Sequence, residues 1–312
     1  MTECSATGRI MGLQQKVREG LRRVGPGFPC RHRRFILSAQ APDGGFAGRE
    51  GGADLYYTHF GLRAADVLGL DGADDFWGGA AGFFEGVDGP VRDVVECYCE
   101  AFGRAVLARV AYHPRPGAEA GDRTARLKDA CRSELPGGGR PAGLYRVFLA
   151  YMALELLGER PPADAVARFV TDRRCADGGF GDTRDAERGS LNPTAAGIVL
   201  LCRCDRETDA AGAGEFLAGL QRDDGGFPAH PDAPASDLMS TFTALVALEE
   251  LGQLDRMRLG GAARFARGLA ADDGGFLGAP GDKEVDVEYS FYGLGVIGLL
   301  SHVVGAAGTD NG

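Results

Sequence analysis

Lysine is nearly absent from this chain of 312 residues: only Lys16, Lys128 and Lys283 occur among 34 basic side chains. Acidic residues outnumber basic ones by 44 to 34, so the formal net charge is −10. A negative surface repels phosphate backbones and anionic head groups. We therefore do not expect nucleic acid or an anionic membrane surface as the main partner.

Long hydrophobic runs are also missing, since no uninterrupted apolar stretch reaches the ~20 residues of a membrane span. The N-terminal region contains no apolar segment typical of a secretory signal, and residues 8–24 have the pattern of a short amphipathic helix. The eight cysteines lie mostly inside apolar helical segments. These features indicate a reducing, cytoplasmic compartment and no membrane span.

Strand-like alternation of β-branched residues is absent, whereas glycine is abundant, with 50 copies and no collagen-like period. Many of these glycines belong to a repeated turn, Asp-Gly-Gly-Phe. The spacings between its four copies are 134, 47 and 49 residues, so the long gap has room for two more. Degraded versions stand there, VDGPV at 87–91 and PGGGR at 136–140, which makes six repeats. The four intact copies begin at Asp43, Asp177, Asp224 and Asp273.

Each turn separates an amphipathic helical segment from a more apolar one that is rich in Ala and Gly. This pattern predicts an all-α fold in which six helical hairpins close into an α/α toroid (α6-α6 barrel), with the apolar helices inside. An open solenoid is the alternative, but the very apolar sixth inner segment favours closure. We expect an N-terminal segment at 1–29, the toroid domain at 30–304 and a flexible tail at 305–312.

DGGF turns followed by inner segments of the form D-x-x-Y-S/T resemble the protein prenyltransferase β-subunits and the squalene and terpene cyclase repeats. The resemblance covers roughly residues 30–304. It implies a protein that handles isoprenoids, with an isoprenoid or a prenyl diphosphate as ligand. The β-subunits also work with a helical-repeat α-subunit, so the resemblance implies such a partner.

The zinc site of the β-subunits is matched at one position of three. Asp237 stands where the family has an Asp ligand, but Met239 replaces the Cys ligand and Tyr289 replaces the His ligand. A thioether and a phenol are poor zinc ligands. We therefore expect no resident metal and no other cofactor.

The basic residues that hold the diphosphate in the β-subunits are also missing before Asp237, where the sequence reads AHPDAPASD. His230 stands near the position of the family's Arg, and no Lys is present. Other repeats carry Arg49, Arg184, Arg188 and Lys283 in comparable loops. Fixed cations in these loops could substitute for the missing clamp.

The first residues of the inner segments should surround one mouth of the toroid. Carboxylates beside an apolar cavity raise one another's pKa, so one could act as a general acid near neutral pH. Asp286-Val287-Glu288-Tyr289-Ser290 also resembles the cyclase motif D-x-D-D-T, with Glu288 at the acid position. The expected catalytic residues are Glu288, Asp286 and Asp237, and the expected substrate-binding residues are Asp54, Tyr57, His59, Tyr289 and Tyr292.

Three functions remain open at this point: a prenyltransferase-like protein without the zinc site, an acid-initiated terpene cyclase using Glu288 and Asp286, and a toroid that binds a lipid or partner without catalysis.

Asp54, Asp237 and Asp286 also suit ordinary helix capping. In the sixth repeat we expect Glu284 to be solvated, Asp286 to cap the helix, and Glu288 to face the mouth, near His59 if the ring closes. The Asp of each DGGF should be a turn residue. The Cys-x-Cys pairs at 97–99 and 202–204 should be buried rather than metal-binding.

Overall fold

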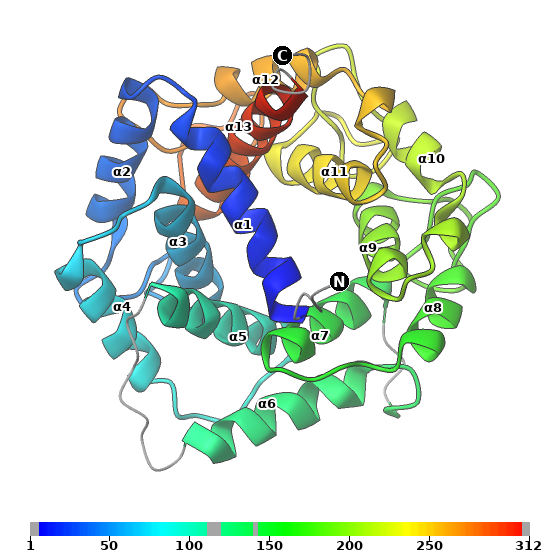
Figure 1. Ribbon diagram of the computed structural model, residues 1–312, viewed down its shortest axis with the longest axis horizontal. Helices are drawn as coiled ribbons and strands as arrows, with labels where there is room; N and C mark the ends of the chain where they lie inside the picture. Colours follow the sequence, from blue (N-terminus) through cyan, green and yellow to red (C-terminus); the bar gives the residue numbers. More distant parts are fainter. Residues whose placement is uncertain (1–5, 111–119, 140–142, 308–312) are drawn as a thin grey trace.

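The computed structural model describes residues 6–110, 120–139 and 143–307, and all regular secondary structure in these ranges is helical. Six helices lie on the inside of a ring and six on the outside (Figure 1). The inner helices are α3 (Leu55–Leu68), α5 (Val94–Arg109), α7 (Leu144–Leu156), α9 (Leu191–Arg203), α11 (Leu238–Glu250) and α13 (Val287–Ala307). The outer helices are α2 (Gly27–Ala39), α4 (Asp74–Glu85), α6 (Ala120–Glu134), α8 (Ala163–Thr171), α10 (Ala213–Gly219) and α12 (Leu259–Gly268). The remaining elements are α1 (Ala6–Arg22) and two short 3-10 helices, Glu207–Ala210 and Leu254–Arg256.

The inner helices form a closed ring. Each packs against the next along the chain, and α13 packs against α3 to complete the circle (Figure 1). The difference between inside and outside follows the sequence pattern, because 12 of the 14 residues of α3 are buried but only two of the 13 in α2. The predicted all-α toroid of six hairpins is confirmed, and the open solenoid is excluded.

In three of the four intact DGGF turns, the aspartate side chain accepts a hydrogen bond from a main-chain N–H of the same turn. The carboxylate of Asp43 accepts the main-chain N–H of Gly45 at 3.0 Å, and Asp177 and Asp224 accept the equivalent N–H groups of their own turns. The prediction that these aspartates are turn residues is confirmed for them. In the fourth copy, His32 accepts the corresponding N–H, that of Gly275.

The phenylalanine that ends each intact turn is completely buried behind its inner helix. The N–H of Phe46 donates to the hydroxyl of Thr58, one turn into α3, at 2.9 Å. The same bond recurs in the other three intact repeats with acceptors Thr194, Thr241 and Ser290, at 2.9–3.1 Å. The Ser/Thr of the repeated motif therefore anchors the turn.

Glycines on the inner helices make room for these phenylalanine rings. A Cβ on Gly61 would lie 2.5 Å from the Phe46 ring, and one on Gly103 would lie 2.2 Å from the Phe84 ring. Phe84 thus fills the equivalent place in repeat 2, where the turn sequence is degraded. In repeat 3, Gly137 and Gly139 both have φ +91°, as expected for a glycine turn, while Arg140 of this predicted turn lies outside the described residues.

The seam of the ring joins repeat 1 to repeat 6 through His32. This histidine on α2 is fully buried, and its Nδ1 accepts the N–H of Gly275 at 3.0 Å. Its ring is stacked on Phe276 with centroids 4.7 Å apart and lies 4.5 Å from the ring of Phe28. A hydrogen bond and a three-ring stack therefore connect residues about 240 positions apart in the sequence.

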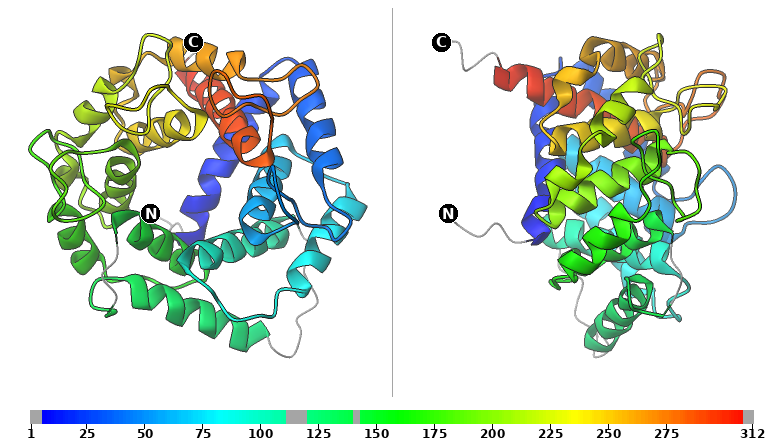
Figure 2. Two further views of the ribbon diagram at one scale, coloured as in Figure 1. Left: turned by 180° about the vertical axis from the view of Figure 1, so that it is seen from behind. Right: turned by 90° about the vertical axis from the view of Figure 1, so that its right-hand side faces the viewer.

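Helix α1 crosses one end of the ring, at the carboxyl ends of the inner helices (Figure 1). It packs on α13 where Gly20 and Gly298 let the two backbones touch, since a Cβ on Gly20 would lie 1.7 Å from the Gly298 carbonyl oxygen. Gln14 adds hydrogen bonds to the Arg63 carbonyl and the Asp66 carboxylate on α3. Figure 2 shows α1 on one face and the loops that lead into the inner helices on the opposite face. Part of the expected segment at 1–29 thus covers one end of the barrel.

Residues 287–305 of α13 are apolar and long enough to cross a membrane by length and composition, with a mean hydropathy of 1.3. From the sequence we expected no apolar segment of this length. We overlooked this one because its glycines, Ser301 and His302 interrupt the apolar run. In the structure 67% of this stretch is buried among the other helices, as in the core helix of a globular fold. The end of the predicted tail, 308–312, lies outside the described residues.

Candidate functional site

Aspartates begin four of the inner helices as N-caps. Asp54, Asp93, Asp237 and Asp286 each accept the main-chain N–H three residues further on, at 2.7–3.0 Å. The cap of α7 comes from another repeat: Asp182 accepts the N–H of Tyr145, because Gly143 has no side chain to offer. The capping interpretation of the predicted aspartates is confirmed.

Asp237 has further bonds to its own helix, since the Ser240 hydroxyl donates to it at 2.8 Å. Burial raises the pKa of Asp237, while the bonds from Ser240 oppose the rise. Tyr289 is half-buried, and burial raises its pKa to about 12, so its phenol is protonated at neutral pH. The carboxylate of Asp237 already accepts hydrogen bonds from Ser240, Met239 offers a thioether, and the phenol of Tyr289 is protonated. These three groups do not fit a zinc ion. No cluster of three His, Cys, Asp or Glu suited to a metal ion occurs in the described ranges.

Asp286 is the most enclosed of the capping aspartates, with 8% of its surface exposed. Arg49, from the loop that follows the first turn, donates to it at 3.0 Å and to Asp282 at 3.2 Å. Burial raises the pKa of Asp286, and the bonds from Tyr289 and Arg49 oppose this. Two repeats that are far apart in sequence therefore meet in one ion-pair cluster at the mouth.

Glu288 is the second residue of α13, two positions after Asp286, and is half-buried, whereas Glu284 is exposed as predicted. The Tyr56 hydroxyl donates to the Glu288 carboxylate at 2.7 Å. Burial raises the pKa of Glu288, and the bond from Tyr56 partly offsets this. We expected Glu288 near His59. Tyr56 contacts both residues: its hydroxyl bonds to Glu288, and its ring centre lies 5.9 Å from that of His59.

The two predicted tyrosines at the mouth, Tyr57 and Tyr289, occupy equivalent places in repeats 1 and 6. Each ring lies against a loop glycine, Gly48 for Tyr57 and Gly278 for Tyr289, at positions where a Cβ would clash. The guanidinium of Arg49 lies 5.8 Å from the centre of the Tyr289 ring. These tyrosines support the loops at the mouth, and neither lines the cavity described next.

A cavity of about 340 Å³ lies inside the ring, within the size range of small-molecule sites. Its wall is mostly aromatic and aliphatic, and Ile10 and Leu13 of α1 contribute at one end. Of the predicted site residues, His59 and Tyr292 line it, whereas Asp54, Tyr57, Asp237, Asp286, Glu288 and Tyr289 lie around it. The aromatic lining consists of Tyr56, His59, Phe60, Tyr98, Phe102, Tyr145, Phe148, Phe242 and Tyr292.

His59 contributes a neutral imidazole to this wall. Its Nδ1 lies 2.5 Å from the Tyr56 carbonyl oxygen, so Nδ1 carries the proton and Nε2 remains an acceptor. Burial, with a smaller effect of the charge on Arg63, lowers the pKa of His59 to about 3. Nε2 is buried and has no hydrogen-bond partner in the structure. His59 is therefore a neutral acceptor without a donor, in the wall of the cavity.

The sequence interpretation missed the charged and amide groups of the cavity: Arg63, Asn192, Arg203 and Glu250 all line it. The signal for Arg63 was an arginine in the middle of the apolar segment GLRAADVLGL. Conversely, the loop arginines proposed as a diphosphate clamp are already paired with acids. Arg188 pairs with Asp232 at 2.9 Å, Arg184 with Asp172 at 3.6 Å, and Arg49 with Asp286 and Asp282. His230 is exposed.

The cysteines are free thiols throughout the described ranges. Cys97 and Cys99 are buried, and Cys99 lines the cavity. Burial raises the pKa of the Cys99 thiol, which keeps it protonated and weakly nucleophilic. The predicted burial is confirmed for Cys97 and Cys99; in the second pair Cys204 is buried but Cys202 is half-buried, so the prediction is wrong for Cys202.

The fold and cavity define a class, the α/α toroids that enclose an apolar site among their inner helices. The model of the prenyltransferase alpha-alpha toroid domain matches residues 30–103 and 140–310. The chain belongs to this family. Among solved structures it is similar to Candida albicans protein geranylgeranyltransferase-I complexed with GGPP, at 15% identity and a TM-score of 0.65, over 85% of this chain and 89% of that one. No curated protein sequence matches the chain significantly.

Proposed function

We propose that the protein binds an isoprenoid chain in its central cavity and is a prenyltransferase-like protein. The observation that carries this proposal is the cavity of about 340 Å³ inside the ring, whose wall is mostly aromatic and aliphatic. Aromatic walls suit the double bonds of an isoprenoid and would stabilise an allylic carbocation. The similar geranylgeranyltransferase-I was solved with GGPP, which supports a chain of this type as the ligand.

The first test is the content of the purified protein. Native mass spectrometry of protein prepared without added metal or lipid, followed by solvent extraction, should reveal a bound isoprenoid. Titration calorimetry with geranylgeranyl diphosphate and with geranylgeraniol then measures affinity directly. Co-purification of a helical-repeat protein would support the partner subunit that the family resemblance implies.

A pair of variants ties binding to the cavity. Phe148 on α7 lines the cavity, so Phe148→Ala should lower the affinity for geranylgeraniol at least tenfold through lost contact area. Phe169 lies on the outer helix α8 against Arg173 and does not line the cavity. Phe169→Ala should leave the affinity unchanged. Equal affinities in the two variants would contradict binding at this cavity.

Acid-initiated cyclisation is a second candidate, favoured by Glu288 at the mouth. Its raised pKa and its bond from Tyr56 are consistent with a carboxyl group that delivers a proton to an alkene. Glu288→Gln keeps the shape and removes the acidity, so it should abolish turnover of an isoprenoid substrate. As a first-turn dipole partner alone, Glu288 would contribute at most ~1 kcal/mol of stability and nothing to turnover. Glu284→Gln, at an exposed acid of the same segment, is the matched control, and full activity of Glu288→Gln would remove the cyclase candidate.

A further inference from the structure

Arg63 is a buried cation in the wall of a cavity that is lined mostly by aromatic and aliphatic side chains. It lies in the middle of α3, and 7% of its surface is exposed. Its guanidinium carbon is 3.8 Å from the centre of the Phe291 ring and 4.4 Å from that of Phe102. The two rings hold the planar group in place, and its side chain contacts the cavity.

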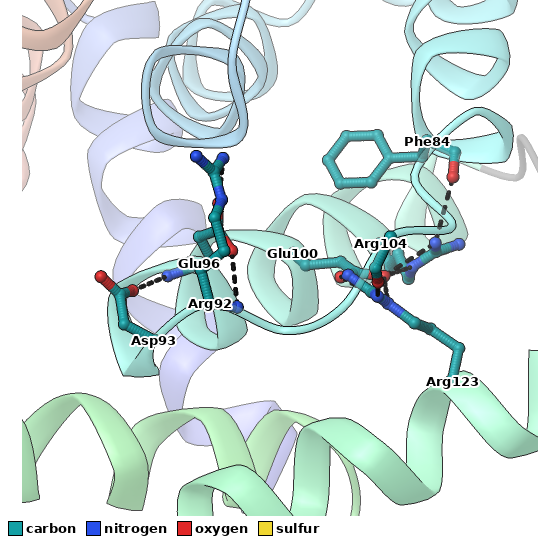
Figure 3. A network of polar contacts seen from close by, with 8 residues as sticks. Phe84, Arg92, Asp93, Glu96, Glu100, Arg104 and Arg123 are labelled. Carbon is teal, nitrogen blue, oxygen red and sulfur yellow. Dashed lines mark hydrogen bonds and ion pairs between the residues drawn. The ribbon is translucent and has the colours of Figure 1, made fainter.

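The other buried arginines of the described chain show what Arg63 lacks. Arg123 pairs with the fully buried Glu100 at 2.6 Å, and Figure 3 shows Glu100 between Arg123 and Arg104. Arg203 pairs with the buried Glu155 at 3.4 Å. No ion pair joins Arg63 to any carboxylate in the described ranges, and its Nε has no hydrogen-bond acceptor.

A buried charge without a counterion is unfavourable, because the interior cannot replace the lost hydration. Stacking on aromatic faces offsets part of this cost but supplies no negative charge. The groups beside Arg63 are the Tyr98 hydroxyl and the imidazole of His59, whose pKa of about 3 leaves it neutral. The other cation of the cavity wall, Arg203, pairs with both Glu155 and Glu250, at 3.4 and 3.7 Å. Arg63 is therefore the cation of this wall that has no ion-pair partner in the described ranges.

We propose that the cavity holds an isoprenoid chain that carries a carboxylate, and that this carboxylate binds the Arg63 guanidinium beside the Tyr98 hydroxyl. The guanidinium fork matches a carboxylate in a bidentate geometry, and Tyr98 would donate a further bond. One unpaired cation balances one negative charge, whereas a diphosphate would require several. This inference rests on the proposed isoprenoid-binding function and specifies the polar group of the ligand.

Titration calorimetry with two ligands of the same chain length, geranylgeranoic acid and geranylgeraniol, tests the inference. The wild-type protein should bind the acid at least tenfold more tightly than the alcohol. Arg63→Met keeps an unbranched stem and removes the charged guanidinium, so it should abolish this preference and leave the affinity for the alcohol within about twofold. Arg132→Met removes one positive charge from the exposed surface of α6 and should preserve the preference. Tyr98→Phe, a second variant with little change of shape, should weaken acid binding about threefold to tenfold.

The outcomes separate this inference from the proposed function. If the acid and the alcohol bind equally to the wild-type protein, or if the preference survives in a folded Arg63→Met variant, the carboxylate site is wrong while isoprenoid binding stands. If neither ligand nor geranylgeranyl diphosphate binds, both proposals are wrong. Should Arg63→Met fail to fold, the wild-type preference and its reduction in Tyr98→Phe decide the matter.

Discussion

Acidification should weaken the seam of the ring through His32. Burial, with a smaller effect of the charge on Arg31, lowers the pKa of His32 from 6.5 to about 4. Between these two pH values the unfolded chain binds a proton that the folded protein does not accept. The stability contributed by neutral His32 is therefore complete above pH 6.5 and is lost as the pH falls toward 4.

The magnitude follows from the two pKa values. At ~1.36 kcal/mol per pH unit, the interval from 6.5 to about 4 corresponds to roughly 3 kcal/mol, of which about 2 kcal/mol should appear between pH 7 and pH 4.5. His32 is fully buried, so solvent screening does not reduce this figure much. The value is a substantial part of the stability of a typical domain.

The assay is urea denaturation from pH 7 to pH 4.5, with the wild type compared to His32→Asn. The amide oxygen of Asn can accept the N–H of Gly275 but does not titrate. The variant should be less stable at pH 7, because it loses the ring stack, and this deficit should shrink by about 2 kcal/mol at pH 4.5.

Other buried groups also titrate in this range, and comparing the two proteins cancels them. His59 acts in the same direction as His32, while the raised pKa of Asp286 and of Glu288 acts in the opposite direction. His230→Asn, at an exposed histidine, is the control and should show a constant difference from the wild type. A constant difference for His32→Asn as well would refute the argument.

Three more predictions concern the turns, the end of the barrel and the metal. Thr241→Val should lower the free energy of unfolding by ~1–3 kcal/mol, because it leaves the buried N–H of Phe227 without its acceptor. Thr243→Val, which removes a hydroxyl bonded only within its own helix, should lower it less. Urea denaturation measures both, and equal losses would contradict the anchoring role. Gly20→Ala should destabilise the protein by ~1–3 kcal/mol or more, because its Cβ would overlap the α13 backbone, while Gly12→Ala, with open space around it, should be neutral or stabilising in the same melting experiment. Elemental analysis should find less than one zinc per chain; one tightly held zinc that is lost in Asp237→Asn would restore a metal mechanism.

Periodicity was sufficient to predict the fold, because each repeat forms the same hairpin through contacts between residues that are close in the sequence. The turn at Asp43 and the hydroxyl of Thr58 are 15 residues apart, and the pattern repeats often enough to be recognised even where the turn is degraded. The capping role of Asp237 and the exposure of Glu284 are also local and were predictable. The places of the capping residues Asp54, Asp237 and Asp286 at the mouth followed from where the inner helices begin.

The cavity groups were not predictable, because they depend on contacts between distant segments. An arginine in an apolar segment marks Arg63 in the sequence, but its lack of a counterion appears only when the surrounding helices are in place. His32 could not be connected with Gly275 by any local rule, since they meet only on closure. The bond between Tyr56 and Glu288 likewise forms only when repeats 1 and 6 meet at the seam, so no local pattern indicated it.

The packing of α1 on α13 has a consequence for biosynthesis. During translation α1 is made before every helix of the ring, and its glycine contact on α13 is made after all of them. The end of the barrel that α1 covers therefore stays exposed until the last helix has left the ribosome. Contacts of such large sequence separation form slowly, and the exposed apolar surface favours aggregation in the meantime. A chaperone that holds the growing chain, or a ligand that enters before α1 docks, would act during this interval.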